Sequence, residues 1–344
     1  MTSLYVDRRG VTLKADGEAL VFYENGERVG TVPLAPLSRV FLRGDVTLSS
    51  SLLGKLGGRG IGVVVLSGRK AEPTLLLARP HNDAARRVAQ YRLSQDGEFR
   101  LRFACGVVEA KLRSQAAFLA EHRDDEPRSR YLLTLALRRM ETAIAAVSGQ
   151  TSIASLRGVE GAGAAAYFEG FGDLLPEHLH FSVRNRRPPR DPVNAALSLG
   201  YTLLHAETVL ALYGSGFDPF IGFYHTLSFG RESLACDVVE PLRVEVDRHI
   251  LQLFRQEKLR ADDFSTVDGG CWLGKAGRAR FYADWEPLAE RLRKRMAEAM
   301  SGLATAMGQV SGVESPAPDR AAAIDEISID DSNTADFAAA AGAF

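Results

Sequence analysis

The hydrophobic period of the sequence changes once, around Ala78-Arg79-Pro80-His81-Asn82-Asp83. Before this point, short Val, Leu and aromatic runs are separated by Gly- and Asp-bearing turns, a pattern typical of β-strands. After it, apolar residues recur at helical spacing. We therefore predict an α+β protein, with a β-rich domain over residues 1–80, a mostly α-helical domain over 81–310 and a tail over 311–344.

Local signals define several of the expected elements. Asn25-Gly26 predicts a hairpin, because both residues accept the positive φ angles of a tight type I′ turn, and Ser49 can cap a short helix. Asp191-Pro192 predicts a helix start, since Asp caps free N–H groups and Pro needs none. The expected strands include Leu4–Val6, Val11–Leu13, Leu20–Tyr23, Val29–Val32, Val40–Leu42 and Ile61–Leu66. The expected helices before Asp191 cover roughly 83–94, 98–122 and 128–148.

The net charge of −1 conceals an uneven distribution. From residue 311 to 344 seven acids stand against Arg320, so removing about −6 from the total leaves the body about +5. A mildly basic body is compatible with a nucleic-acid partner. The tail has few large apolar groups, and we expect it to be disordered.

Cysteine usage and the N-terminus bear on the compartment. The three cysteines, Cys105, Cys236 and Cys271, are far apart and form no CxxC pair, which favours neither a disulfide framework nor a zinc cluster. The N-terminus turns charged before any signal-length apolar stretch, and no run of eighteen apolar residues occurs. We expect a cytoplasmic protein that does not enter a membrane.

The segment from Phe223 to Asp247 concentrates residues that carry chemistry, including His225, Asp237 and Glu240. Helical spacing after Glu232 places Asp237 and Glu240 on one helix face, where they repel each other unless a cation lies between them. Oxygen ligands with one imidazole suit Mn²⁺ or Mg²⁺ better than zinc. The alternative is that the acids are solvated and the histidine is structural.

Glu160 lies in LRGVEGAGAAAYF, between glycines at 158, 161 and 163. Glycines permit close backbone approach, so this carboxylate could reach a shared metal without steric competition. Taken alone, the same pattern is more typical of a contact between two helices through small residues.

Two basic clusters are candidates for phosphate contacts, which position DNA without reading its sequence. The alternative for each arginine is a solvated surface charge. The first cluster contains Arg184, Arg186, Arg187 and Arg190, and the second contains Lys275, Arg278 and Arg280 beside Tyr282.

Three blocks together resemble the CRISPR-associated spacer integrase family: LRGVEGAGAAAYF, RRPPRDPVNAALSLGYTLL and FYHTLSFGRESLACDVVEPLRVEVDR. They occur in that family's order and spacing, and the resemblance covers about residues 1–300. It implies that Glu160, His225 and Glu240 are catalytic metal ligands for Mn²⁺ or Mg²⁺, with Asp237 as a further acid at the site. Arg243 matches a basic residue that follows the acidic pair, and we expect it among the DNA contacts.

The resemblance also implies a reaction and an assembly. A 3′-hydroxyl of a short double-stranded DNA fragment would attack a phosphodiester of CRISPR repeat DNA, and water in its place would give nicking. Because a two-ended fragment needs two active sites, we expect a homodimer formed through the β-rich domain. A small CRISPR-associated partner dimer would bridge two integrase dimers. Two alternatives stay open: a non-catalytic DNA-binding assembly protein, and a general metal-dependent phosphodiesterase for branched or single-stranded DNA.

Overall fold

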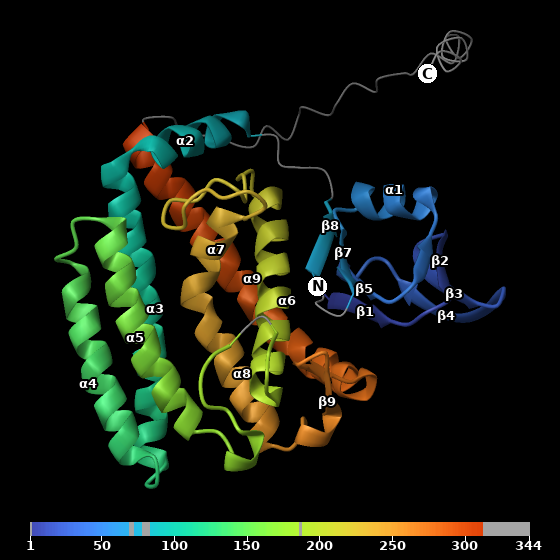
Figure 1. The fold of residues 1–344 in the computed structure, drawn as a ribbon. Coiled ribbons are helices and arrows are strands. Elements are labelled where there is room, and N and C mark those ends of the chain that lie inside the picture. Colours follow the sequence, from blue (N-terminus) through green and yellow to red (C-terminus); the bar gives the residue numbers. More distant parts are fainter. Residues whose placement is uncertain (1, 69–71, 78–82, 186–187, 312–344) are drawn as a thin grey trace. The chain divides into compact units, whose positions relative to one another are not determined.

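The computed structural model describes residues 2–68, 72–77, 83–185 and 188–311, all of which belong to one compact unit, Met1–Val313 (Figure 1). Strands dominate the chain up to residue 76, and long helices dominate from residue 84 onward. The predicted α+β class is therefore confirmed. The predicted boundary near 78–83 and the predicted tail fall largely outside the described residues.

Two four-stranded sheets form the strand-rich part. The first is mixed and has the order β1-β5-β7-β8, in which β1, β5 and β7 run parallel and β8 runs antiparallel to β7. The second has the order β4-β3-β2-β6. The strands are β1 (Thr2–Asp7), β2 (Val11–Asp16), β3 (Ala19–Glu24), β4 (Glu27–Pro33), β5 (Leu37–Arg43), β6 (Val46–Leu48), β7 (Gly62–Ser67) and β8 (Glu72–Leu76).

The two central strands of the first sheet, β5 and β7, are buried on both faces. Val40 and Val63 point into the core between the sheets, whereas Phe41 and Val64 belong to the core shared with the helices. Alternate residues of a strand face opposite sides, so a strand covered on both sides needs a continuous apolar run. This explains why these two segments read as uninterrupted hydrophobic stretches.

The local signals read from the sequence are confirmed. Asn25 and Gly26 have φ angles of 52° and 87° at the β3–β4 hairpin. Ser49 caps α1 (Ser50–Gly58) by accepting from the N–H of Leu52. Asp191 likewise accepts from the N–H of Asn194, with Pro192 in the first turn.

The helical part contains two groups of neighbouring helices. Helices α3, α4 and α5 pack against one another, while α6 contacts α7, α8 and α9 (Figure 1). A small hairpin of β9 (Phe264–Val267) and β10 (Gly270–Leu273) precedes α9. The helices are α2 (Ala84–Gln95), α3 (Gly97–Asp125), α4 (Arg130–Val147), α5 (Ile153–Asp173), α6 (Pro192–Gly214), α7 (Ser233–Val239), α8 (Arg243–Arg255) and α9 (Lys275–Ser311), with short 3-10 turns η1 (Glu177–Leu179), η2 (Glu240–Leu242) and η3 (Ala261–Asp263).

Helix α6 is long and apolar enough to cross a bilayer, but 78% of its most apolar window is buried inside the protein. A helix that is apolar all round is expected at the centre of a large core. Its contacts with α7, α8 and α9 place α6 there.

A partly buried ionic cluster connects the first sheet to α9. Glu286 of α9 accepts from the backbone N–H of Ser3 at 2.9 Å and from the Tyr5 hydroxyl at 3.3 Å. Arg293, two turns further along α9, donates to Glu207 of α6 at 2.8 Å and also pairs with Glu286. The sheet, α6 and α9 are therefore held together by paired charges as well as by apolar contacts.

Candidate metal centre

The candidate site is built from α3, α5, η2 and the loop before α7. Glu160 comes from α5, Glu240 begins η2 and His225 lies in the loop. Helix α7 ends at Val239, just before Pro241, which has no N–H to continue the helix. The sequence predicted one helix face carrying Asp237 and Glu240, and Glu240 does keep helical angles, with φ of −54° and ψ of −49°. The two carboxylates nevertheless contact different partners, His225 for Asp237 and Lys111 with Arg243 for Glu240.

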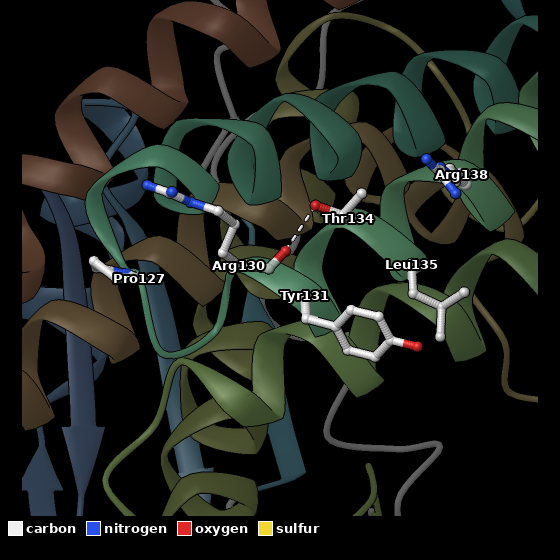
Figure 2. A pocket seen from close by; sticks show the side chains of 6 residues that line it. All are labelled: Pro127, Arg130, Tyr131, Thr134, Leu135 and Arg138. Carbon is white, nitrogen blue, oxygen red and sulfur yellow. Dashed lines mark hydrogen bonds between the residues drawn. The ribbon is translucent and has the colours of Figure 1, made fainter.

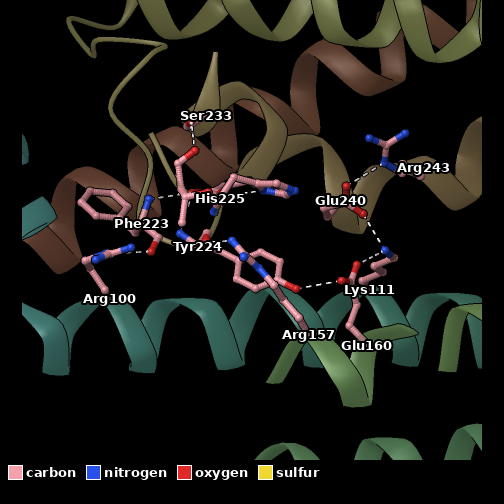
Figure 3. Close-up of polar contacts among 12 residues, drawn as sticks. Arg100, Lys111, Arg157, Glu160, Phe223, Tyr224, His225, Ser233, Glu240 and Arg243 are labelled. Atoms are coloured by element: carbon pink, nitrogen blue, oxygen red, sulfur yellow. Dashed lines mark hydrogen bonds and ion pairs between the residues drawn. The ribbon is translucent and has the colours of Figure 1, made fainter. Parts of the chain in front are cut away.

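Lys111 of α3 lies between the two glutamates (Figure 3). Its Nζ forms an ion pair with Glu160 Oε1 and lies 2.7 Å from Glu240 Oε2. Glu240 Oε1 accepts from Arg243 Nε at 3.0 Å. Burial favours the neutral acid, but Arg243 and Lys111 outweigh it and lower the pKa of Glu240 to about 2. The site therefore concentrates negative charge around a buried cation.

Tyr224 fixes the second carboxylate oxygen of Glu160. Its hydroxyl donates to Glu160 Oε2 at 2.7 Å, and burial together with the charge of Glu160 raises the pKa of this tyrosine. Arg157, one turn before Glu160 on α5, donates to the Tyr224 carbonyl at 3.4 Å and lies over its ring. These contacts connect the loop that carries His225 to α5.

Asp237 is fully buried and accepts four hydrogen bonds. Its Oδ2 receives the N–H groups of Phe223 and Tyr224, and its Oδ1 receives the N–H of His225 at 2.8 Å. His225 Nδ1 lies 2.7 Å from the same Oδ1. With Nδ1 as the donor, the Nε2 atom of His225 is left as the acceptor nitrogen. Asp237 therefore orients the histidine and its loop.

The loop backbone at Gly222 lies close to α7, and this close approach lets Asp237 reach the loop. A Cβ on Gly222 would lie 2.7 Å from the Ser233 carbonyl carbon and 2.8 Å from Asp237 Oδ2. Glycine is needed at this position because any larger side chain would push the loop away from α7.

Among the described residues, no group of three His, Cys, Asp or Glu side chains lies in metal-binding geometry. The two carboxylates that could begin such a group are engaged by Lys111 instead. The chemistry of the donors nevertheless fits a hard divalent ion with one nitrogen ligand, because carboxylates and an imidazole oriented by a second carboxylate are the usual components. Carboxylates with one imidazole nitrogen are donor types that Mn²⁺ and Mg²⁺ accept.

The predicted DNA contacts differ in their surroundings. Arg190 and Lys275 are exposed. Arg184 donates to Asn194 and Ser198, and Arg278 donates to Asp7 at 2.6 Å. Arg243 pairs with Glu240 and lies 4.7 Å from the centre of the Tyr201 ring, whereas Arg280 pairs with Asp263. Arg186 and Arg187 lie outside the described residues.

Sequence reasoning missed Lys111 and Tyr224. A signal for Lys111 was available, because Val108, Lys111, Leu112 and Gln115 share one face of α3 and all four are buried. A lysine on an apolar helix face needs a buried partner of opposite charge. Tyr224 carried no comparable signal, since buried tyrosines are common.

A pocket of about 520 Å³ lies away from these residues, along α4 (Figure 2). It is lined by Pro127, Arg130, Tyr131, Thr134, Leu135 and Arg138. None of the candidate metal ligands takes part in it.

Comparison with known proteins places the chain in a family. The model of the family described as CRISPR associated protein Cas1 matches residues 4–287. The chain is 40% identical over 296 residues to CRISPR-associated endonuclease Cas1 1 of Thermodesulfovibrio yellowstonii, which covers 85% of this chain and 93% of that relative. The chain therefore belongs to the CRISPR-associated Cas1 family, whose curated relatives are named endonucleases.

Solved structures agree on the fold. A Cas1 protein from Thermotoga maritima superposes with a TM-score of 0.76 at 23% identity, covering 89% of this chain and 97% of that chain. A chain of a Cas6-RT-Cas1–Cas2 complex gives the same TM-score at 26% identity, covering 90% of this chain and 35% of that chain.

Proposed function

We propose that Glu160, His225 and Glu240 hold a divalent metal ion, Mn²⁺ or Mg²⁺, with which this CRISPR adaptation integrase cuts and joins DNA phosphodiesters. The observation that carries the proposal is the meeting of two carboxylates, from α5 and η2, on one buried cation. Family membership favours an enzyme over a non-catalytic assembly protein. The contact between His225 Nδ1 and the buried carboxylate of Asp237 supports the same choice.

A bound metal would lower the pKa of an attacking hydroxyl and offset the charge of the scissile phosphate. The protein's own residues prepare the site for that charge. Arg243 holds one oxygen of Glu240, and Tyr224 holds one oxygen of Glu160. Asp237 holds Nδ1 of His225. Each proposed ligand therefore has a partner that fixes its orientation. Metal ligands in proteins usually have such hydrogen-bond partners.

The substrates follow from the family. A 3′-hydroxyl of a short double-stranded fragment would attack repeat DNA of the CRISPR array, and water at the same site would nick DNA. Branched or single-stranded DNA would serve the second reaction, so a general phosphodiesterase activity is the second candidate. Among the described residues, Arg190 and Lys275 are exposed predicted phosphate contacts, and Arg280 is exposed as well but pairs with Asp263.

The test uses Glu160→Gln, Glu240→Gln and His225→Ala. Glutamine preserves volume, which matters because Glu240 is buried against Arg243 and Lys111. We expect each variant to lose Mn²⁺-dependent transfer of a labelled 3′-hydroxyl fragment to a repeat-bearing plasmid, with non-specific DNA affinity nearly unchanged. Glu245→Gln, which alters a more exposed acid paired with Arg295, is the control. Full strand transfer by Glu160→Gln at saturating Mn²⁺ would contradict the assignment.

The assembly is a separate proposal. A structural relative is part of a complex named for Cas1 and Cas2. We infer a homodimer formed through the β-rich part, with a Cas2-type partner dimer bridging two such dimers. Light scattering of the purified chain tests the first step, and a monomer at micromolar concentration would reject it. For the second step, fragment integration should depend strongly on the partner, whereas nicking of branched DNA should not.

A further inference from the structure

Lys111 occupies the position at which the proposed metal ligands converge. It comes from α3 and is only 8% exposed. It bridges Glu160 of α5 and Glu240 of η2, which are eighty positions apart in sequence. The same carboxylates that would bind a divalent ion therefore already bind an ammonium group.

The arrangement is stable as it stands. The Lys111 Nζ atom forms an ion pair with Glu160 and lies 2.7 Å from Glu240 Oε2, so one ammonium group offsets the charge of both carboxylates. Without this cation, the buried Glu240 and the partly buried Glu160 would face each other with no ammonium group between them. Breaking a buried ion pair by removing one partner is strongly destabilising. Lys111 therefore links α3 to α5 and η2.

The ammonium and a divalent ion cannot share these oxygens in the same way. An ammonium group has three donors and no lone pair, so it cannot itself become a ligand while it is charged. A divalent ion between Glu160 and Glu240 would meet a positive group within contact distance, and both Glu240 and Lys111 are buried. Repulsion between like charges is strongest in such surroundings.

We infer that Lys111 is the resident counter-ion of the metal-free site and that a divalent ion binds by displacing it. The inference rests on the proposed metal site. It adds that the Lys111 ammonium group competes with the divalent ion for Glu160 and Glu240. The ammonium holds the two glutamates in place before the metal arrives. Its displacement opposes metal binding, so Lys111 also weakens the affinity of the site.

The first experiment compares Mn²⁺ binding to wild type and Lys111→Met by calorimetry. We expect the variant to bind Mn²⁺ tighter by about tenfold or more, a size typical of linked binding equilibria. Its melting temperature in EDTA should fall below that of wild type, and saturating Mn²⁺ should narrow the gap. Lys258→Met removes a more exposed lysine that pairs with Asp284. This control should change neither the Mn²⁺ affinity nor the melting temperature in EDTA.

The second experiment uses the wild-type protein, so it does not depend on the variant folding. Acylation of lysine amines, read by mass spectrometry, should label Lys111 slowly in EDTA and faster with Mn²⁺. Lys258 should be labelled equally in both conditions.

The outcomes separate this inference from the proposed function. Equal or weaker Mn²⁺ binding by Lys111→Met, or labelling of Lys111 that does not respond to Mn²⁺ while the ion binds, would overturn the displacement. Failure of both wild type and Lys111→Met to bind Mn²⁺ would instead reject the metal site itself, and the displacement with it.

Discussion

Asp237 Oδ1 lies 2.7 Å from His225 Nδ1 and also accepts the backbone N–H of the same histidine at 2.8 Å. One carboxylate oxygen therefore fixes both the ring and the backbone of a proposed metal ligand. Asp237→Asn keeps the size but removes the charge. We expect Mn²⁺-dependent nicking to fall about 10- to 100-fold, the usual effect of losing such a support, together with a lower melting temperature.

Asp284→Asn, at the acid that pairs with Lys258, is the matched control and should leave nicking unchanged. If Asp237→Asn nicks DNA at the wild-type rate with limiting Mn²⁺, Asp237 does not orient the histidine for catalysis.

The glycines beside Glu160 predict opposite effects of one substitution. A Cβ on Gly163 would lie 2.5 Å from Leu112 Cδ2 and 3.4 Å from the Ala143 Cβ, whereas a Cβ on Gly161 meets nothing within 4 Å. We expect Gly163→Ala to lower the free energy of unfolding by about 1–3 kcal/mol through overpacking. Gly161→Ala should be neutral or stabilise by up to about 1 kcal/mol. Urea denaturation measures both, and equal effects would contradict the packing of α5 on α3.

His249 predicts a loss of stability in acid. It lies against Phe281 and Trp285, its Nε2 has no hydrogen-bond partner among the described residues, and burial lowers its pKa to about 4. The unfolded chain binds the proton more readily, so stability present above about pH 6.5 is lost as the pH falls towards 4. Over this pH range, the free energy of unfolding of wild type should fall by up to about 3 kcal/mol more than that of His249→Phe. Parallel pH profiles of the two proteins, from urea denaturation, would show that the histidine does not contribute.

Asp247 predicts the opposite slope over the same range. Burial raises its pKa to about 6, although the hydroxyls of Tyr201 and Tyr167 donate to it and favour the charged form. Its stabilising contribution is present below about pH 3.8 and is lost as the pH rises through 6. Between pH 4 and 7, wild type should lose up to about 3 kcal/mol relative to Asp247→Asn. A constant difference between the two proteins across this range would show that Asp247 titrates normally.

Most of the secondary structure follows from local patterns. The Asn25-Gly26 turn, the Ser49 cap and the Asp191-Pro192 start depend on residues that are neighbours in sequence, and each is confirmed. The strands β6, β8, β9 and β10 were not predicted, because they are short and three to five residues carry little periodic signal.

The site was less predictable because its contacts join distant segments. The sequence treated the glycines at 158, 161 and 163 as equivalent, but only Gly163 closely approaches another helix, since the rotation of α5 decides which face packs. The sequence predicted a divalent ion beside Asp237 and Glu240, and it did not predict an ammonium group there. The contact of Lys111 with Glu240 follows only from the packing of α3 against η2.

The contact between Ser3 and Glu286 spans 283 positions of the chain. Ser3 belongs to β1, an edge strand of its sheet, and the side chain that accepts its N–H is synthesised 283 residues later. At roughly 5–20 residues per second, translation of the intervening chain takes on the order of a minute or less, during which the edge lacks this partner. Water can satisfy the Ser3 N–H in the meantime, but the edge of β1 stays open to pairing with another strand. A chain that ends before α9 should therefore be more prone to aggregate than one that includes it.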